Sequence, residues 1–154
     1  MPSSQDVGAA LKGTKPVWTL HTADVDGDGR KDVLLLLTDS IDHWVVRVLF
    51  NRGDGTLDAG RAVDVVLPDE DVPQDVTTIR TDPSTTRRSL AIAAAAGVYL
   101  LPWTGSSFGP PQNLSSNGAT TVAAGDVDGD GVDDLVVGHE GTVSVWFQHA
   151  VGEK

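Results

Sequence analysis

Short apolar runs separated by polar, glycine-rich stretches make up most of the chain, and no long amphipathic helix pattern appears. The runs KDVLLLL from Lys31, SLAIAAAA from Ser89 and VDDLVVG from Val132 are typical of buried strands bounded by turns. The alanines at 93–96 also suit a helix, but the adjoining Ile92 and the glycine turn that follows favour a strand. The pattern therefore predicts an all-β protein.

The same succession of predicted strands, loops and turns occurs three times along the sequence. Each copy has a strand, a polar loop, an apolar strand, a glycine-containing turn and a further strand. The first and third loops read DVDGDGRKD from Asp24 and DVDGDGVDD from Asp126, which places them 102 residues apart. The middle copy, with TDPSTTRR from Thr81, keeps the order but has lost the acidic loop. Two steps averaging 51 residues are close to the ~40–50 residues of propeller repeats.

The two acidic loops have the composition and spacing of a calcium-binding loop. Aspartates fall at positions 1, 3, 5 and 9 of each loop: Asp24, Asp26, Asp28 and Asp32 in the first, and Asp126, Asp128, Asp130 and Asp134 in the second. Calcium takes about six to eight oxygen ligands, and alternating positions turn three carboxylates inward as the chain curls. Position 7 offers the backbone carbonyl of Arg30 or Val132, and the glycine at position 6 permits the sharp turn. A bound cation would offset the repulsion among the aspartates.

The acidic loops have three other interpretations: an EF-hand, a magnesium site and a turn that binds no ion. An EF-hand needs flanking helices and a glutamate at position 12, where this chain has Leu35 or Val137 inside an apolar strand. Magnesium suits the loops less well than calcium, because it demands a rigid octahedron and keeps its waters. A solvated Asp-Gly turn that binds nothing stays open, since these residues favour turns on their own.

Several segments together resemble the FG-GAP/VCBS repeat family, the β-propeller blades of the integrin-α type. They are DVDGDGRKDVLLLL from Asp24, FNRGDGTL at 50–57, SSFGPPQNL at 106–114 and GDVDGDGVDDLVVG at 125–138. The resemblance implies four-stranded antiparallel blades with calcium held between the first two strands, and it implies no single activity. The expected fold class is all-β, with three four-stranded antiparallel β-propeller blades.

The resemblance divides the single domain, residues 1–154, into three blades. They are expected at 13–66, at 67–114 with the degenerate loop, and at 115–154 completed by residues 5–12 as a displaced outer strand. Three blades are too few for a ring, because closed propellers have about four to eight. We therefore expect either the remainder of a larger propeller or a homo-oligomer, and a dimer giving six blades is the simplest closure.

Composition and charge narrow the class of partner. The formal net charge is −11, and the two acidic loops contribute −2 and −5 of it, so the acidity is concentrated there. This favours a hard cation over nucleic acid. The absence of cysteine excludes disulfides, thiolate zinc sites and cysteine nucleophiles. No apolar run is long enough for membrane insertion. We expect an extracellular or cell-surface location, although no signal peptide is visible at the start of the chain.

No arrangement typical of catalysis is present in the sequence. It contains no G-x-S-x-G, P-loop or H-E-x-x-H pattern, and its four histidines have neither zinc nor triad spacing. The expected function is therefore that of a non-enzymatic, calcium-binding module for protein binding or scaffold assembly. The alternatives are a carbohydrate-binding lectin, with a glycan ligand, and an accessory portion of a secreted enzyme.

Two further features have both a structural and a functional interpretation. Trp44, Trp103 and Trp146 fall in the third strand of each blade, where packing between blades is expected and sugar stacking is the alternative. The tripeptide Arg-Gly-Asp at 52–54 spells an integrin-recognition sequence, but inside NRGDGT it is expected to serve its own turn.

Overall fold

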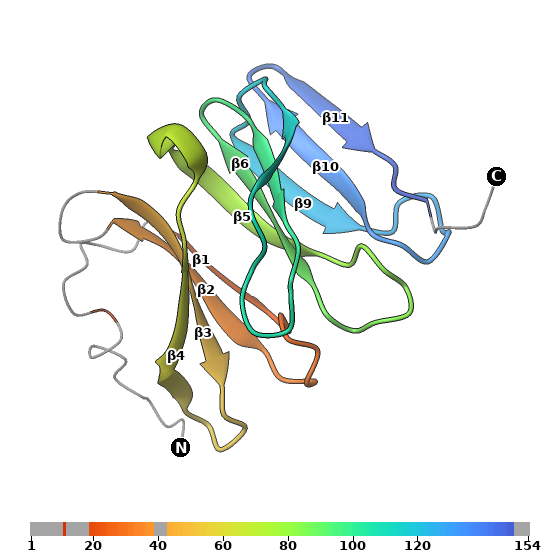
Figure 1. Cartoon of the computed structure of the whole chain (residues 1–154). Helices are drawn as coiled ribbons and strands as arrows, with labels where there is room; N and C mark the ends of the chain where they lie inside the picture. Colours follow the sequence, from red (N-terminus) through yellow and green to blue (C-terminus); the bar gives the residue numbers. More distant parts are fainter. Residues whose placement is uncertain (1–10, 12–18, 39–42, 150–154) are drawn as a thin grey trace, which may run out of the picture.

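The computed structural model describes residue 11 and residues 19–38 and 43–149 (Figure 1). In this part of the chain the strands form three antiparallel sheets, and no α-helix is present. One 3₁₀ turn, η1 (Pro68–Glu70), lies between the first sheet and the second. None of the described residues form a helix that is long and apolar enough to cross a membrane. The all-β prediction is confirmed.

Each sheet is a meander in which consecutive strands are hydrogen-bonded neighbours. The first sheet comprises β1 (Thr19–Ala23), β2 (Asp32–Thr38), β3 (Trp44–Asn51) and β4 (Leu57–Val65). The second comprises β5 (Pro73–Ile79), β6 (Ser89–Ala94), β7 (Val98–Leu101) and β8 (Gln112–Ser115). The third comprises β9 (Thr121–Gly125), β10 (Asp134–His139) and β11 (Thr142–Trp146).

The first two sheets thus have the four antiparallel strands that the sequence predicts, whereas the third has three within the described residues. Its fourth strand was expected from residues 5–12, of which the structure describes Leu11 alone. Leu11 lies in a turn and packs against the first sheet. The placement of this outer strand therefore stays a prediction.

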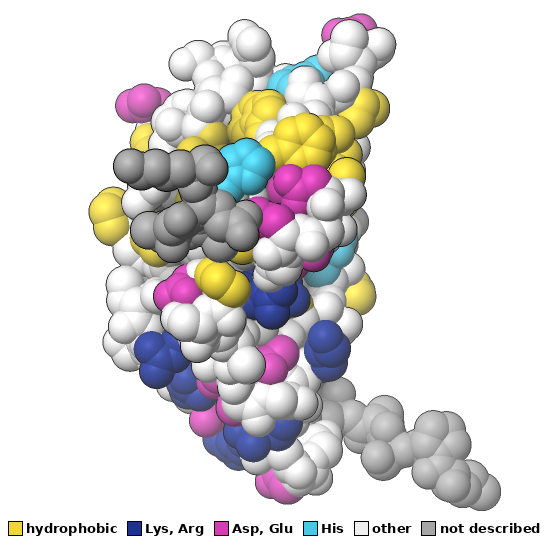
Figure 2. Space-filling model, turned by 90° about the vertical axis from the view of Figure 1, so that its right-hand side faces the viewer, with side chains coloured by type: hydrophobic (Ala, Val, Ile, Leu, Met, Phe, Trp, Pro, Cys, Tyr) yellow, Lys and Arg dark blue, Asp and Glu magenta, His cyan; other side chains and the backbone are white. Residues whose placement is uncertain are grey.

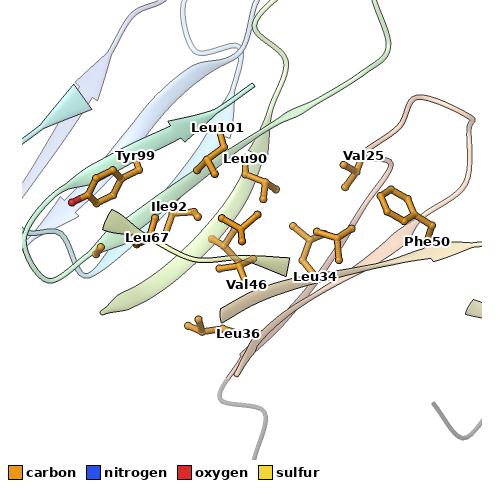
Figure 3. Packing of buried hydrophobic residues seen from close by; sticks show 14 residues of the cluster. Val25, Leu34, Leu36, Val46, Phe50, Leu67, Leu90, Ile92, Tyr99 and Leu101 are labelled. Atoms are coloured by element: carbon orange, nitrogen blue, oxygen red, sulfur yellow. The ribbon is translucent and has the colours of Figure 1, made fainter. Parts of the chain in front are cut away.

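The seam between the first and second sheets holds the larger core cluster. Leu34 and Leu36 of β2 point into it, and Leu90 and Ile92 of β6 meet them from the second sheet (Figure 3). Because successive residues of a strand point to opposite faces, Leu35 and its neighbours on alternate positions cover the other side of the first sheet. Burial on both faces explains why β2 is a continuous run of leucines.

The seam between the second and third sheets is built from smaller side chains. Ala91 and Ala93 of β6 are fully buried there, and Leu135 and Val137 of β10 pack against them. Close approach also requires Gly118, where an added Cβ would collide with the backbone of the second sheet. The predicted strand over the alanine run is confirmed for the residues that β6 contains.

The three tryptophans that were assigned to the blades lie at the seams, as the inter-blade interpretation predicts. Trp44 and Trp103 pack against the cluster between the first two sheets, and Trp146 packs against the second seam. Trp44 and Trp146 belong to the third strands β3 and β11. The third-strand assignment of Trp103 is wrong, because β7 ends before Pro102, which has no N–H to donate. Trp103 instead forms an isolated bridge with Phe108, their ring centroids 4.9 Å apart.

A single carboxylate links the first strands of all three sheets. Asp75 of β5 lies with its Oδ1 3.1 Å from Nε2 of His21 on β1. Its Oδ2 accepts hydrogen bonds from the Thr121 hydroxyl, at 2.7 Å, and from the Val122 amide, at 3.1 Å, both on β9. The inner strands are therefore held together by polar contacts in addition to the apolar seams.

The loops that join the first two strands of each sheet lie along one edge of the molecule, at the lower right of Figure 1. Backbone bonds tie each loop to the next. The Arg88 amide donates to the Val25 carbonyl at 3.0 Å, and the Asp133 amide donates to the Arg80 carbonyl at 3.4 Å. The two acidic loops are thus separated by the middle loop, residues 80–88, which contacts both.

Candidate metal centre

The first acidic loop folds around the carboxylate of its first aspartate. Asp24 Oδ1 accepts the Gly27 amide at 2.8 Å, and Oδ2 accepts the Gly29 amide at 2.8 Å. Gly29 has a φ of +86°, a conformation that costs other residues energy because of their Cβ. Asp28 Oδ1 accepts the amide of Arg30 at 2.9 Å and closes the next turn. Backbone donors therefore fix the direction of these side chains.

Asp32, the last aspartate of this loop, is the first residue of β2 and is fully buried. Its Oδ2 accepts the Val25 amide and its Oδ1 accepts the Asn51 amide, both at 2.9 Å. Burial raises the pKa of the Asp32 carboxyl above its ordinary value, although these two amides oppose the change. One side chain thus connects the loop, the second strand and the end of the third strand.

The second acidic loop repeats this arrangement bond for bond. Asp126 accepts the amides of Gly129 and Gly131, at 2.7 and 3.0 Å. Asp134 is fully buried, and it accepts the Val127 amide at 2.8 Å and the Gln148 amide at 2.9 Å. The amide of Gln148, with further help from Val127, lowers the pKa of the Asp134 carboxyl. Two segments 102 residues apart therefore build the same frame.

The frame brings the aspartates at positions 1, 3 and 9 together in each loop. Carboxylate oxygens, one from each residue, lie within 4.8 Å of one another in two groups: Asp24, Asp26 and Asp32, and Asp126, Asp128 and Asp134. Position 5 differs between the loops. Asp28 forms an ion pair with Arg30, whereas Asp130 groups with Asp128 and His149. The role of the Arg30 and Val132 carbonyls as ligands stays a prediction.

The donor set suits a hard divalent cation. Three carboxylates that converge from one loop are the ligand type that calcium prefers, and they leave room for carbonyls and waters to complete the coordination. Asp130 Oδ2 is buried without a hydrogen-bond partner, which is costly for a carboxylate unless a cation satisfies it. The residues present therefore fit calcium at both loops.

Arginines of the middle loop are the part of this region that sequence reasoning missed. Arg88 Nη1 lies 2.7 Å from Asp133 Oδ2, and the Arg80 amide donates to the same oxygen at 2.9 Å. Arg80 Nη2 also donates to the Gly131 carbonyl at 2.6 Å. Arg80 directly follows β5 as Asp126 follows β9. Alignment of the loops would have shown an arginine at the position of the first aspartate.

In the first acidic loop, the arginines that contact the aspartates belong to the same sheet and loop. Arg61 of β4 donates from Nη1 to Asp26 Oδ2 at 3.0 Å, and its guanidinium lies 4.1 Å from the centre of the Phe50 ring. Together with the pair between Arg30 and Asp28, this places an arginine on two of the four aspartates.

The Arg-Gly-Asp tripeptide serves its own turn between β3 and β4. Arg52 pairs with Asp58 at 2.8 Å, and Asp54 accepts the Thr56 amide at 2.9 Å. The Thr56 hydroxyl also bonds Asp54 and lowers the pKa of that carboxyl. Asp54 is thus engaged within the turn, and Arg52 is engaged with the start of β4.

Comparison with known proteins identifies one repeat directly. Residues 118–146 match the family model of the FG-GAP repeat, and this segment contains β9, the second acidic loop, β10 and β11. The resemblance to the FG-GAP family that the sequence indicates is therefore confirmed. No curated protein matches the chain.

Proposed function

We propose that the chain is a calcium-binding β-propeller-type module that serves in protein binding or scaffold assembly, without catalytic activity. The observation that carries the proposal is the repeated frame: two loops with the same spacing hold three carboxylates each in the same way. One of the two loops lies inside the FG-GAP repeat. An extracellular or cell-surface location, where calcium is abundant, accords with this function.

Calcium at these loops would stabilise the folded chain. Asp24, Asp26 and Asp32 would hold one ion and Asp126, Asp128 and Asp134 the other, with Asp28 and Asp130 as further candidates. The ion would neutralise the convergent carboxylates and link the loop to the second and third strands of its sheet. At ~1 mM calcium and a dissociation constant of ~10⁻⁴ M, each site would add about 1.4 kcal/mol to the free energy of unfolding.

The surroundings of the carboxylates support a structural role over catalysis. Asp32 and Asp134 are buried and bonded to backbone amides, so they are not exposed to a substrate. Trp44, Trp103 and Trp146, for which sugar stacking is the alternative, are partly buried and pack against the core clusters at the two seams. This favours a binding or assembly module over a lectin that stacks sugars on these rings.

The experiment is a titration of the full chain with calcium, with magnesium as the control ion. We expect two sites by calorimetry and a melting temperature about 6–11 °C lower in EDTA, from ~2–4 °C per kcal/mol for a chain of this size. The double variant Asp24→Asn/Asp26→Asn should remove one site, and Asp126→Asn/Asp128→Asn the other.

Asp82→Asn in the middle loop is the matched control, because Asp82 is exposed and, among the described residues, bonds Ser84 and the Thr85 amide of its own loop. It should leave both sites intact. Identical melting curves in calcium and in EDTA would contradict the proposal.

A further inference from the structure

The middle loop, residues 80–88, has the opposite charge to the two loops beside it. It contains three arginines and one aspartate, a net charge of +2, whereas the acidic loops carry −2 and −5. The last residue of β5 pairs with Ser89 as the last residue of β1 pairs with Asp32, so Ser89 stands where the first loop has its buried aspartate. Arg80 stands at the position of the first aspartate. The middle loop thus lacks two of the three carboxylates that converge in each acidic loop.

The positive charge lies at the edge of the molecule where the loops are. The loops that join the first two strands of each sheet are at the lower right of Figure 1. Figure 2, which turns this side to the viewer, shows Lys and Arg side chains in its lower half, with Asp and Glu among them. A local positive surface on a chain of net charge −11 attracts an anionic partner at that place.

A pocket of about 320 Å³ lies between the middle loop and the turn that joins β7 to β8. Thr81, Arg87 and Ser89 line it on the side of the loop, and Pro102 and Trp103 line it on the side of the turn. Ligand pockets have volumes of roughly 300–1,000 Å³. The pocket is therefore large enough for the head of a polar side chain.

Arg87 supplies a charge to this pocket that no described residue neutralises. Its amide donates to Thr85 Oγ1 at 3.1 Å, but its guanidinium has no partner among the described residues. A Cβ added at Gly105 would lie 3.7 Å from Arg87 Nη1, so the guanidinium reaches the turn on the far side of the pocket. Arg88, the next residue, is instead paired with Asp133.

Buried polar atoms without a hydrogen-bond partner also differ between the loops. Among the described residues, the one in the second acidic loop is an acceptor, Asp130 Oδ2. The other two are donors, Nε of Arg80 in the middle loop and Nε1 of Trp103 in the pocket lining. Asp82 also lines the pocket, but its Oδ1 already accepts the Ser84 amide at 2.8 Å and the Ser84 hydroxyl at 2.6 Å. Because the unpaired groups here are donors, the missing component is an acceptor.

We propose that this pocket binds the carboxylate of an acidic side chain from a partner protein, with Arg87 as its counter-charge. A planar guanidinium bonds a carboxylate through two parallel N–H groups, and the hydroxyls of Thr81 and Thr85 are further donors in the lining. Pro102 and Trp103 offer an apolar wall to the methylene groups of the bound side chain. The inference rests on the protein-binding role of the proposed function and names the chemistry of the partner, but it uses neither acidic loop.

The charges of the lining favour a carboxylate over a phosphate group. A phosphate group carries a charge of about −1.5 to −2 at neutral pH. The Ser84 hydroxyl and amide lower the pKa of the Asp82 carboxyl, which is therefore ionised and repels a dianion more than a single negative charge. With Arg88 paired to Asp133, Arg87 alone remains to balance the ligand. One arginine matches one carboxylate.

The test is a titration of the full ¹⁵N-labelled chain, in EDTA, with an acetylated peptide that has two central glutamates, followed by NMR of the indole N–H signals. The chain has four tryptophans, and Trp103→Phe identifies the signal from the pocket. We expect this signal to shift and to saturate at roughly millimolar peptide. The same peptide with glutamines should leave it unmoved. Arg87→Gln should weaken binding about tenfold or more, and it should retain the fold because Arg87 is exposed.

Arg52→Gln is the matched control, because Arg52 is an exposed arginine that is paired with Asp58 outside the pocket. It should leave peptide binding unchanged, whereas Asp82→Asn should tighten it about two- to fivefold by removing a negative charge from the lining. An unmoved Trp103 signal, an equal response to the glutamine peptide, full binding by Arg87→Gln, or tighter binding of inorganic phosphate would each overturn the inference. A saturable shift in EDTA would support it even if neither acidic loop bound calcium.

Discussion

The two acidic loops have one backbone frame and different counter-charges. In both, the first aspartate gathers glycine amides and the last one is buried and bonded to the end of the third strand. In the first loop Arg61 and Arg30 contact two of the aspartates. In the second loop no arginine is paired with the aspartates at positions 1, 3, 5 and 9, among the described residues, and His149 lies 3.6 Å from Asp130.

This difference shows that the backbone shape of a loop and the neutralisation of its charge depend on different residues. The bonds that the first aspartate accepts from two glycine amides, and the last aspartate from a valine amide and the end of the third strand, recur in both loops. The frame is therefore present whichever cationic side chain lies nearby. The positive charge that faces the aspartates differs between the loops. In the middle loop Arg80 replaces the first aspartate, and Arg80 and Arg88 both bond the neighbouring acidic loop. Substitutions that remove the amide bonds of the frame should therefore have larger effects than substitutions that remove a neighbouring arginine.

The largest effect is expected from loss of the buried aspartate. Asp32→Ala leaves the amides of Val25 and Asn51 without their acceptor, and Asp134→Ala does the same to Val127 and Gln148. We expect each to lower the free energy of unfolding by about 2–5 kcal/mol in urea denaturation. Ser89→Ala, at the equivalent position of the middle sheet, should cost less than about 1 kcal/mol. Equal losses of unfolding free energy in the Asp32, Asp134 and Ser89 variants would contradict a stabilising role for the bonds that the two aspartates accept.

A smaller loss of stability is expected when the ion pair between the middle loop and the second acidic loop is removed. Arg88→Met keeps the apolar stem but removes the ion pair with Asp133, which is largely buried. We expect a loss of about 1–3 kcal/mol, because the Asp133 charge loses one of its donors. Arg87→Met is the control, since Arg87 is exposed and adjacent in sequence. Equal stability of the two variants by thermal denaturation would refute a role for the pair.

The smallest effect concerns calcium affinity at the first loop. Arg61 is paired with Asp26, so a cation bound there must compete with the guanidinium. Arg61→Gln should tighten calcium binding at the first loop by roughly two- to fivefold, the size expected for an exposed ion pair of up to ~1 kcal/mol. Arg52→Gln, which breaks an exposed pair outside the loop, should change neither site. Calorimetry resolves the two sites, and weaker binding in Arg61→Gln would contradict this prediction.

The sequence predicted the strands and the turns of the two acidic loops well, because these features are local, whereas Asp28 and Asp130, which were expected to point inward at position 5, lie outside the two groups of three aspartates. The leucine run of β2, the alanines of β6 and the Asp-Gly spacing each specify their own conformation through alternation, burial and turn preference. The convergence of Asp24, Asp26 and Asp32 follows from the same local pattern.

Contacts between sheets could not be predicted in the same way. The middle loop was interpreted as a copy that had lost its acidic residues, and the bonds of Arg80 and Arg88 to Asp133 were not predicted, because Asp133 lies 45 or more residues away in the sequence. Trp103 was assigned to a strand that ends two residues earlier, since the effect of Pro102 on the strand edge depends on which neighbour it would pair with. Both errors concern partners that the fold alone brings together.

The carboxylate of Asp75 has a mechanical consequence. It bonds β1 on one side and β9 on the other, so the second sheet is coupled directly to the first and to the third. β1 is the first strand of the described chain, so a pull on that side loads the contact between His21 and Asp75 before it reaches the outer strands. We therefore expect the three inner strands to resist such a pull together, because the Thr121 and Val122 bonds pass the load on to the third sheet.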